Sequence, residues 1–388
     1  MRTDAVRKAE ELTDLLRSEA PRLDAEGLFP EKGLRALRDC GLMGLLVPHR
    51  YGGLDGDLGD LADVAQILAG GCLSTALIWA MHCQQVDVLV RHAEPALAGR
   101  LLPRVATGEL YLASITTEPG KGGHLLSAEA PLHEAGEQLR VSREAPVVTG
   151  GRYADGFLVT MRSGTGARPN DVRLVYLDRR QAVVEDGRSW NALGMRATQS
   201  GGLRLDGCVP ADQLVGEPGA FRAIAVESMI PAGHIGWAAC WLGVARSALH
   251  DVIGLIRSPA RPRGLDPRSD LVQERVAQVR IDLELVSAYL NRVVAEVSAA
   301  RAEGRPVDAE GIQIHLNTLK VAAARLTFQA VDRLVQLAGL SVGYLKDSPI
   351  PLERHFRDLR SASLNNADDR LLTATGALTL LDRAAHLA

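Results

Sequence analysis

Two adjacent threonines and a glycine-rich turn are the residues whose types could most readily bind a ligand. Thr116 and Thr117 follow an apolar, strand-like stretch, and Pro119-Gly120 and Gly122-Gly123 come soon after them. Proline presets φ, and glycine can adopt positive φ or let a ligand approach the backbone closely. The turn therefore offers N–H groups and two hydroxyls that could hold a flat, polar-edged ring or a pyrophosphate. An ordinary hairpin tip has a similar composition, so this stretch alone leaves both interpretations open.

Composition and charge argue against several classes of function. The 388 residues suffice for two or three domains, and 46% of them are hydrophobic, as in a globular protein. The net charge of −3 gives no electrostatic attraction to nucleic acid or to an anionic membrane. The chain also lacks a run of about 18 apolar residues that could span a membrane. We therefore expect neither nucleic acid nor a membrane as a partner.

The cysteines and the N-terminal residues indicate a compartment. Five cysteines are scattered along the chain without a CxxC pair, so we expect reduced thiols and no metal site. The first residues contain no apolar segment of the kind that a signal peptide needs. These features predict a cytoplasmic protein.

The first region that must position the threonine pair reads as helical, over residues 1–108. Leu12, Leu15 and Leu16 recur at helix spacing. The block from Leu58 through Leu89 is also helical and unusually apolar, which predicts a helix buried in the middle of a domain. His82 ends its most apolar stretch. We favour a buried, hydrogen-bonded structural role for this histidine over one in which it faces a substrate.

The hydrophobic period changes to two between about Tyr111 and Leu214. Short alternating segments are separated by turns that contain Gly, Asp and Asn, which is typical of strands. This pattern predicts a small antiparallel barrel or sandwich of roughly 100 residues. The expected strands cover residues 111–115, 139–142, 146–149, 156–160, 172–177, 182–184 and 203–205.

From Ala220 the pattern is helical to the end of the sequence. One long helix is expected from about Leu271 to Ala302, where Gly304 and Pro306 stop it. A second has apolar residues at alternating steps of three and four, which predicts a bundle helix with a continuous seam. That seam comprises Ile312, Leu316, Leu319, Ala323, Leu326, Ala330, Leu334 and Leu337.

Several motifs resemble those of the acyl-CoA dehydrogenase superfamily, in the same order along nearly the whole chain. Residues 117–122, Thr-Glu-Pro-Gly-x-Gly, are similar to the family's flavin loop. The segment ending in Tyr51-Gly52-Gly53 resembles "VPxxYGG", and residues 102–109 resemble "LPxxxxGE". Residues 193–200 resemble "LGxRxTxS", and residues 351–358 resemble "PxERxxRD".

The resemblance implies a multidomain α+β fold, the acyl-CoA dehydrogenase fold. It implies an N-terminal helical domain over residues 1–108, a central antiparallel β-barrel over residues 109–217 and a C-terminal four-helix bundle over residues 218–388. Members of this family associate as homodimers or homotetramers through the last domain, which we expect here too.

The resemblance also implies FAD as the cofactor. Thr116 and Thr117 match positions at the pyrimidine edge of the flavin, and Thr149 matches a threonine whose hydroxyl faces flavin N5. Val147 replaces the tryptophan that usually covers one flavin face, which predicts a more open cofactor. A plain strand threonine is the alternative for Thr149. The cofactor-binding residues predicted in this part of the chain are Ser114, Thr116, Thr117, Gly122, Gly123, Val147 and Thr149.

Three more cofactor-binding residues are implied on a neighbouring subunit. Gln336, Gly339 and Gly343 resemble a "QxxGGxGY" turn that reaches the partner's FAD, with one residue inserted and Leu340 in place of the second glycine. The family's pyrophosphate-binding arginine lies in a motif that is eroded here. Either Arg261 or Arg263 could supply that charge, or the segment could be a solvated basic loop.

The proton-abstracting glutamate of the family has no carboxylate counterpart here. Asn366 falls at its usual C-terminal position, and an amide does not accept a proton at neutral pH. A second position used by some members is Gly233, with His234 beside it. The predicted catalytic residues are therefore His234 and Asn366. His234, Asp368 or Asp369 could substitute as the base, but a structural role is favoured for each, and the two aspartates could cap the last helix.

The substrate is expected to be a small acyl or hydroxyacyl group held as a thioester. Gly123-His124 replaces the family's Ser-Asp, whose serine helps bind CoA, so an acyl carrier protein is as plausible as CoA. This resembles dehydrogenase-like enzymes of polyketide or peptide biosynthesis. The expected electron acceptor is a flavoprotein or O2. Two alternatives remain: a flavin-dependent monooxygenase that uses reduced flavin and O2, and a scaffold without activity.

Overall fold

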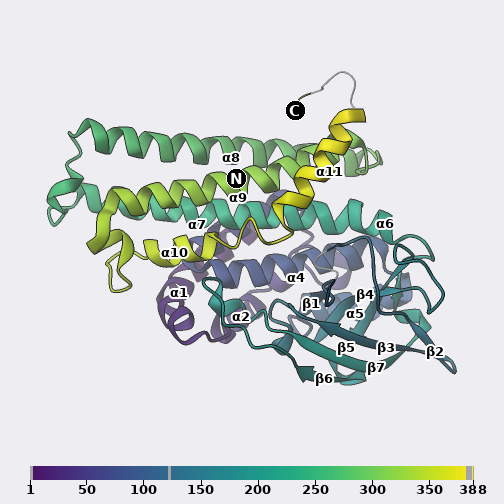
Figure 1. Ribbon diagram of the computed structural model, residues 1–388. Coiled ribbons are helices and arrows are strands. Elements are labelled where there is room, and N and C mark those ends of the chain that lie inside the picture. Colours follow the sequence, from purple (N-terminus) through teal and green to yellow (C-terminus); the bar gives the residue numbers. More distant parts are fainter. Residues whose placement is uncertain (1–2, 121–123, 382–386, 388) are drawn as a thin grey trace.

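The computed structural model describes residues 3–120, 124–381 and 387, and it consists of two groups of helices and a β region (Figure 1). Long helices from the C-terminal part form one layer. The N-terminal helices and the strands lie side by side against it. This is the predicted order of a helical, a β and a second helical region.

The N-terminal helices enclose an apolar core. They are α1 (Asp4–Glu26), α2 (Glu31–Asp39), α3 (Leu58–Gly71), α4 (Leu73–His92) and α5 (Pro95–Ala106). Asp57 caps α3 by accepting hydrogen bonds from the backbone N–H groups of Gly59 and Asp60. Most residues of α4 are buried, as its composition predicted, and α4 packs against both α3 and α7 (Ile230–Arg257).

His82 has the structural role that the sequence favoured. Its ring is buried on α4, where one nitrogen bonds the carbonyl of Met43 at 3.0 Å and the other accepts from the N–H of Leu112 at 3.0 Å. Burial lowers the pKa of His82 to about 4, so the ring is neutral at pH 7. His82 thereby ties the start of the β region to the N-terminal helices.

The β region consists of two four-stranded sheets. One has the order β1-β4-β5-β8 and the other β2-β3-β7-β6, so the sandwich is the better description of the two forms that the pattern allowed. The expectation of purely antiparallel pairing is wrong for β1 and β4, which run parallel. The strands are β1 (Leu112–Ile115), β2 (His133–Ala135), β3 (Gln138–Ala145), β4 (Gly156–Arg162), β5 (Val172–Asp178), β6 (Ala182–Asp186), β7 (Leu203–Pro210) and β8 (Leu214–Val215).

The predicted strand over residues 146–149 is wrong: these residues form a loop after β3. Pro146 lacks the N–H that would continue the pairing of β3 with β7, and the N–H of Val148 instead donates to the carbonyl of Gly201 at 3.0 Å. Gly150 then turns the chain with a φ of 61°.

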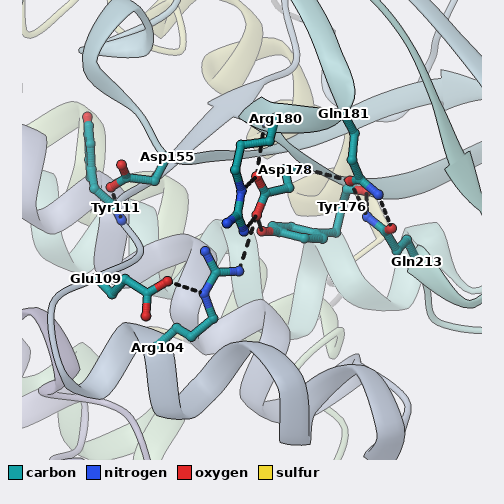
Figure 2. Close-up of polar contacts among 9 residues, drawn as sticks. All are labelled: Arg104, Glu109, Tyr111, Asp155, Tyr176, Asp178, Arg180, Gln181 and Gln213. Atoms are coloured by element: carbon teal, nitrogen blue, oxygen red, sulfur yellow. Dashed lines mark hydrogen bonds and ion pairs between the residues drawn. The ribbon is translucent and has the colours of Figure 1, made fainter.

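A polar network joins α5 to the β region (Figure 2). Asp178 at the end of β5 accepts hydrogen bonds from Arg104 of α5 at 3.2 Å and from Nε of Arg180 at 2.9 Å. Beside it, Asp155 accepts the backbone N–H of Tyr111 at 2.9 Å. These contacts hold the entry of β1, and β1 leads directly into the threonine pair.

The C-terminal region has three long helices: α7, α8 (Asp270–Ala302) and α9 (Glu310–Gly339). The two long helices predicted from sequence correspond to α8 and α9. Two short helices, α10 (Leu352–Leu359) and α11 (Asp368–Leu381), pack on α9 in place of a fourth long one. A short α6 (Phe221–Ile224) and a π-helical turn, η7 (Ala225–Met229), lead into α7, and a second such turn, η9 (Leu340–Tyr344), follows α9.

One helical stretch in the described part of the chain could cross a membrane by length and composition alone. It is Phe221–Arg257, which comprises α6, η7 and α7, and 61% of its most apolar window is buried inside the fold. Burial of this kind is also the pattern of a core helix. The helix packs against α3, α4 and α9.

Candidate functional site

The threonine loop after β1 is anchored by a buried ion pair. The carboxylate of Glu118 accepts the backbone N–H groups of Glu129 at 2.9 Å and Ala130 at 2.8 Å, and it pairs with the guanidinium of Arg143. Arg143 also donates to the carbonyl of Thr117 at 3.1 Å. The side chain of Arg143 is 0% exposed and that of Glu118 is 4% exposed. Charged hydrogen bonds of this kind are among the stronger ones, so they fix the backbone that follows Thr116.

The Glu118–Arg143 pair was not anticipated from the sequence. A signal for it exists, because Val141, Arg143 and Ala145 all lie on the buried face of β3. An arginine on the inward face of a strand needs a buried partner. Glu118 is the acidic residue of the threonine loop, so the two could have been paired on these grounds.

The loop over residues 146–149 lies directly beside the threonine loop. The hydroxyl of Thr117 donates to the carbonyl of Val147 at 2.9 Å. The side chain of Val147 is 42% exposed, which is unusual for a large apolar residue beside so many buried ones. The fold thus places the loop that contains Val147 and Thr149 against the loop that contains Thr116 and Thr117. Ser114 lies just before them on β1, half-buried and opposite Leu158 of β4.

A chain of hydroxyls orients Thr149. Its Oγ1 lies 3.1 Å from the hydroxyl of Ser200, which lies in turn 2.8 Å from the hydroxyl of Thr198. Thr198 donates to the carbonyl of Met195 at 2.8 Å. Because Ser200 holds the Thr149 hydroxyl, it belongs to the site as a positioning residue. The sequence alone does not reveal this role, although Thr198 and Ser200 belong to the "LGxRxTxS" motif.

The loop around Met195, which supports Thr198, is also held by the C-terminal region. The carboxylate of Asp358 on α10 accepts the backbone N–H of Met195 at 2.5 Å. Burial raises the pKa of Asp358 to about 6, while the bond from Met195 acts in the opposite direction. A Cβ on Gly194 would come within 2.1 Å of the Arg357 carbonyl, so only glycine permits this close approach.

The two predicted catalytic residues meet. Nδ2 of Asn366 lies 3.1 Å from Nε2 of His234, although the residues are far apart in sequence. The other ring nitrogen of His234, Nδ1, bonds the carbonyl of Leu316 on α9 at 3.1 Å. Burial and the nearby Lys320 lower the pKa of His234 to about 3. His234 is therefore neutral at pH 7 with both ring nitrogens engaged, which argues against it as a replacement for the missing base.

Asp368, the alternative base, is held in an ion pair. Its carboxylate lies 2.7 Å from the ammonium of Lys320, whose side chain is fully buried on α9. Arg325 is 3.7 Å from the other carboxylate oxygen, and the ring of Trp241 packs against the ammonium at 5.6 Å. This pair fixes the start of α11, two residues after Asn366. Asp369 is exposed.

The residues predicted to reach a partner's cofactor lie elsewhere in the chain. Gln336 is about 30 Å along α9 from Leu316, the residue that contacts His234, at 1.5 Å per residue. It is bonded to Asp332 and Arg275. Gly339, with a φ of 71°, and Gly343 lie just beyond it. One protomer therefore does not bring this turn to His234 and Asn366. Gly122 and Gly123 lie outside the described residues.

The side-chain chemistry of these two loops suits the edge of a flavin ring. Side-chain hydroxyls of Thr116, Thr117 and Thr149 supply hydrogen-bonding groups for a polar edge, and the exposed Val147 supplies an apolar surface for a ring face. The buried anchors beneath them, Glu118–Arg143 and Ser200, hold this arrangement before any ligand arrives. Such preorganisation lowers the cost of binding.

Two descriptions of protein families match parts of this chain. Residues 4–109 match the family described as "Acyl-CoA dehydrogenase, N-terminal domain", and residues 235–366 match "Acyl-CoA dehydrogenase, C-terminal domain". The chain is 24% identical over 346 residues to the short-chain specific acyl-CoA dehydrogenase of Clostridium acetobutylicum. That alignment covers 88% of this chain and 87% of the relative.

Solved structures share the fold over almost the whole chain. FMN-bound TdsC from Paenibacillus sp. A11-2, a dibenzothiophene monooxygenase, has a TM-score of 0.88 at 22% identity and covers 98% of each chain. The prolyl acyl carrier protein oxidase AnaB has a TM-score of 0.84 at 19% identity, with coverage of 98% of this chain and 99% of that one. With both terminal regions matched and this fold between them, the chain belongs to the acyl-CoA dehydrogenase family of flavoenzymes.

Proposed function

We propose that this protein is an FAD-dependent oxidoreductase that acts on a small acyl or hydroxyacyl group held as a thioester. The observation that carries the proposal is the hydrogen bond between Asn366 and His234. The bond joins the two positions where the family pattern leads us to expect a proton-abstracting glutamate. An amide and a neutral imidazole occupy these positions instead. The site thus keeps the flavin loops and lacks the usual base.

An absent base favours some substrates over others. Removal of an α-proton from a saturated thioester needs a base, and general-base catalysis typically contributes about 10² to 10⁴ in rate. Oxidation of a carbon that bears a hydroxyl does not: hydride leaves the carbon, the proton on oxygen passes to water, and a carbonyl forms. A bound flavin would supply the acceptor for that hydride and pass the electrons to a flavoprotein or to O2.

The residues of this chain would hold and shield the reactants. In this proposal Thr116 and Thr117 bind the pyrimidine edge of the ring, and the hydroxyl of Thr149, which is bonded to Ser200, meets the reacting edge. Asn366 is held against α7 by His234 and would contact the substrate. Gly123-His124 replaces the family's Ser-Asp, so the serine that helps bind CoA is missing from this sequence. For this reason an acyl carrier protein is the carrier we favour, and AnaB, which has the same fold, acts on such a carrier according to its name.

The test is anaerobic flavin reduction, followed by stopped-flow absorbance. Small hydroxyacyl thioesters should bleach the flavin, and butyryl-CoA and octanoyl-CoA should do so slowly. Exchange of the α-hydrogen into deuterated water should be slow for every substrate. Rapid reduction by octanoyl-CoA together with rapid α-exchange would show that a base is present and would overturn the proposal.

A monooxygenase is the second candidate, and Val147 is the observation that favours it. Its exposed side chain replaces a covering tryptophan and leaves one face of a bound ring more open to O2. The fold is also that of TdsC, a monooxygenase solved with FMN. If no thioester reduces the flavin, and the chemically reduced protein incorporates oxygen from O2 into an added substrate, this second function replaces the first.

We also propose that the protein is a homodimer or homotetramer. Gln336, Gly339 and Gly343 lie too far along α9 to complete the site of their own protomer, and a partner would bring them to it. The adjoining surface is apolar: Leu340 and Tyr344 of η9 are exposed, and so are Ile281 and Leu285 of α8.

A further inference from the structure

The tautomer of His234 is determined by its surroundings. Nδ1 faces the carbonyl of Leu316, which can only accept a hydrogen bond, so Nδ1 carries the proton. The ring is buried between α7 and α9 against Trp237, and its low pKa excludes a second proton at neutral pH. Nε2 is therefore an acceptor.

This tautomer determines how the amide of Asn366 is turned. Only the Nδ2 end of Asn366 can donate, so Nδ2 must face Nε2 of His234, as the 3.1 Å contact has it. The Oδ1 end then points away from His234. Within residues 3–120 and 124–381 no side chain or backbone group donates to this oxygen, and Asn366 is half-buried. Its backbone has a φ of 48°, a left-handed conformation that asparagine tolerates better than most residues.

We infer that Asn366 Oδ1 is a hydrogen-bond acceptor that selects substrates carrying a hydroxyl at the reacting end, and that His234 is the positioning residue that locks it in this role. The inference rests on the proposed function and narrows its substrate class. An acceptor in a half-buried site favours a group that can donate and disfavours one that can only accept. A saturated acyl chain leaves the oxygen without a partner, and a ketone places two acceptors together.

The experiment measures binding without turnover. The protein is loaded with FAD, the flavin is chemically reduced under argon, and calorimetry gives the dissociation constants of four pantetheine thioesters. Two carry a hydroxyl, 2-hydroxybutyryl and 3-hydroxybutyryl. Butyryl lacks the oxygen, and 3-oxobutyryl offers an acceptor only. We expect at least one hydroxy ester to bind about tenfold more tightly than butyryl, as one hydrogen bond of about 1.4 kcal/mol gives.

Variants separate selection from general structure. Asn366→Gly removes the amide, and glycine adopts the positive φ without strain, so the preference for the hydroxy ester over butyryl should fall to within about twofold. His234→Phe keeps the ring and frees the amide to turn, so 3-oxobutyryl should gain at least threefold relative to the hydroxy ester. Asn365→Ala is the matched control and should keep the wild-type ratios. Flavin content shows that each variant is folded.

The outcomes separate the inference from the function it rests on. If the wild type binds thioesters but treats hydroxy and saturated forms alike, or if Asn366→Gly keeps the preference, the inference is wrong and the proposed function stands. If the flavin-loaded wild type binds no thioester, the proposed function fails and the inference fails with it.

Discussion

Replacing Glu118 by glutamine should loosen the loop that carries Thr116 and Thr117. The carboxylate is 4% exposed and binds the guanidinium of Arg143 together with the N–H groups of Glu129 and Ala130. Glutamine keeps the shape, but it removes the charge and turns one acceptor into a donor that faces donors. Breaking a buried ion pair by changing one partner costs about 3–5 kcal/mol.

The consequence for cofactor binding follows from that cost. If the loop is released in the free protein, FAD must order it on binding. An ordering cost of about 3 kcal/mol corresponds to a dissociation constant about a hundredfold larger. The assay is titration of the apoprotein with FAD, followed by flavin fluorescence, together with the thermal unfolding midpoint. Glu129→Gln is the control, because it makes the same chemical change on an exposed side chain whose backbone N–H belongs to the same cluster. An FAD affinity within threefold of wild type at an unchanged midpoint would refute the anchoring role of the pair.

Three further predictions concern the C-terminal region. Lys320→Met leaves the buried carboxylate of Asp368 without its partner and should lower the free energy of unfolding by about 3–5 kcal/mol. The double variant Lys320→Met with Asp368→Leu should recover most of that loss. Urea denaturation measures both free energies, and a double variant no more stable than the single one would contradict this prediction. The pKa of Asp358 is raised from 3.8 to about 6, so its protonated form stabilises the fold below pH 4 and this contribution is lost as the pH rises through 6. The stability of wild type relative to Asp358→Asn should therefore fall by about 2 kcal/mol between pH 4 and pH 7, and a difference that is flat with pH would show that Asp358 ionises normally. Light scattering should give a mass of two or four chains, and a 41.6 kDa monomer that holds FAD tightly would count against the shared site.

The parts of the fold that could be predicted from sequence depend on local patterns. The steps of three and four in α9, the apolar run of α4 and the Pro-Gly turn after Thr117 each encode their own structure within a few residues. The structural role of His82 could be predicted for a related reason, because a helix that is apolar on most sides buries whatever polar residue it contains.

The parts that could not be predicted depend on contacts between distant residues. A period of two identifies β1 and β4 as strands but carries no information on their parallel pairing. Val147 and Thr149 have strand propensity, yet Pro146 and the contact of Val148 with Gly201 make a loop there. The low pKa of His234 results from its burial between helices and from Lys320, neither of which its neighbours in sequence reveal.

The contacts of α10 with the loop around Met195 have a consequence for folding during synthesis on the ribosome. Asp358 holds the N–H of Met195, and Arg357 donates to the carbonyl of Leu193 at 3.0 Å while it pairs with Asp24 of α1. The support of Thr149 through Ser200 is thus completed by residues made more than 150 positions later. A nascent chain that stops before α10 would have its strands and N-terminal helices but an unsupported loop. The cofactor should therefore be captured only after α10 has left the exit tunnel.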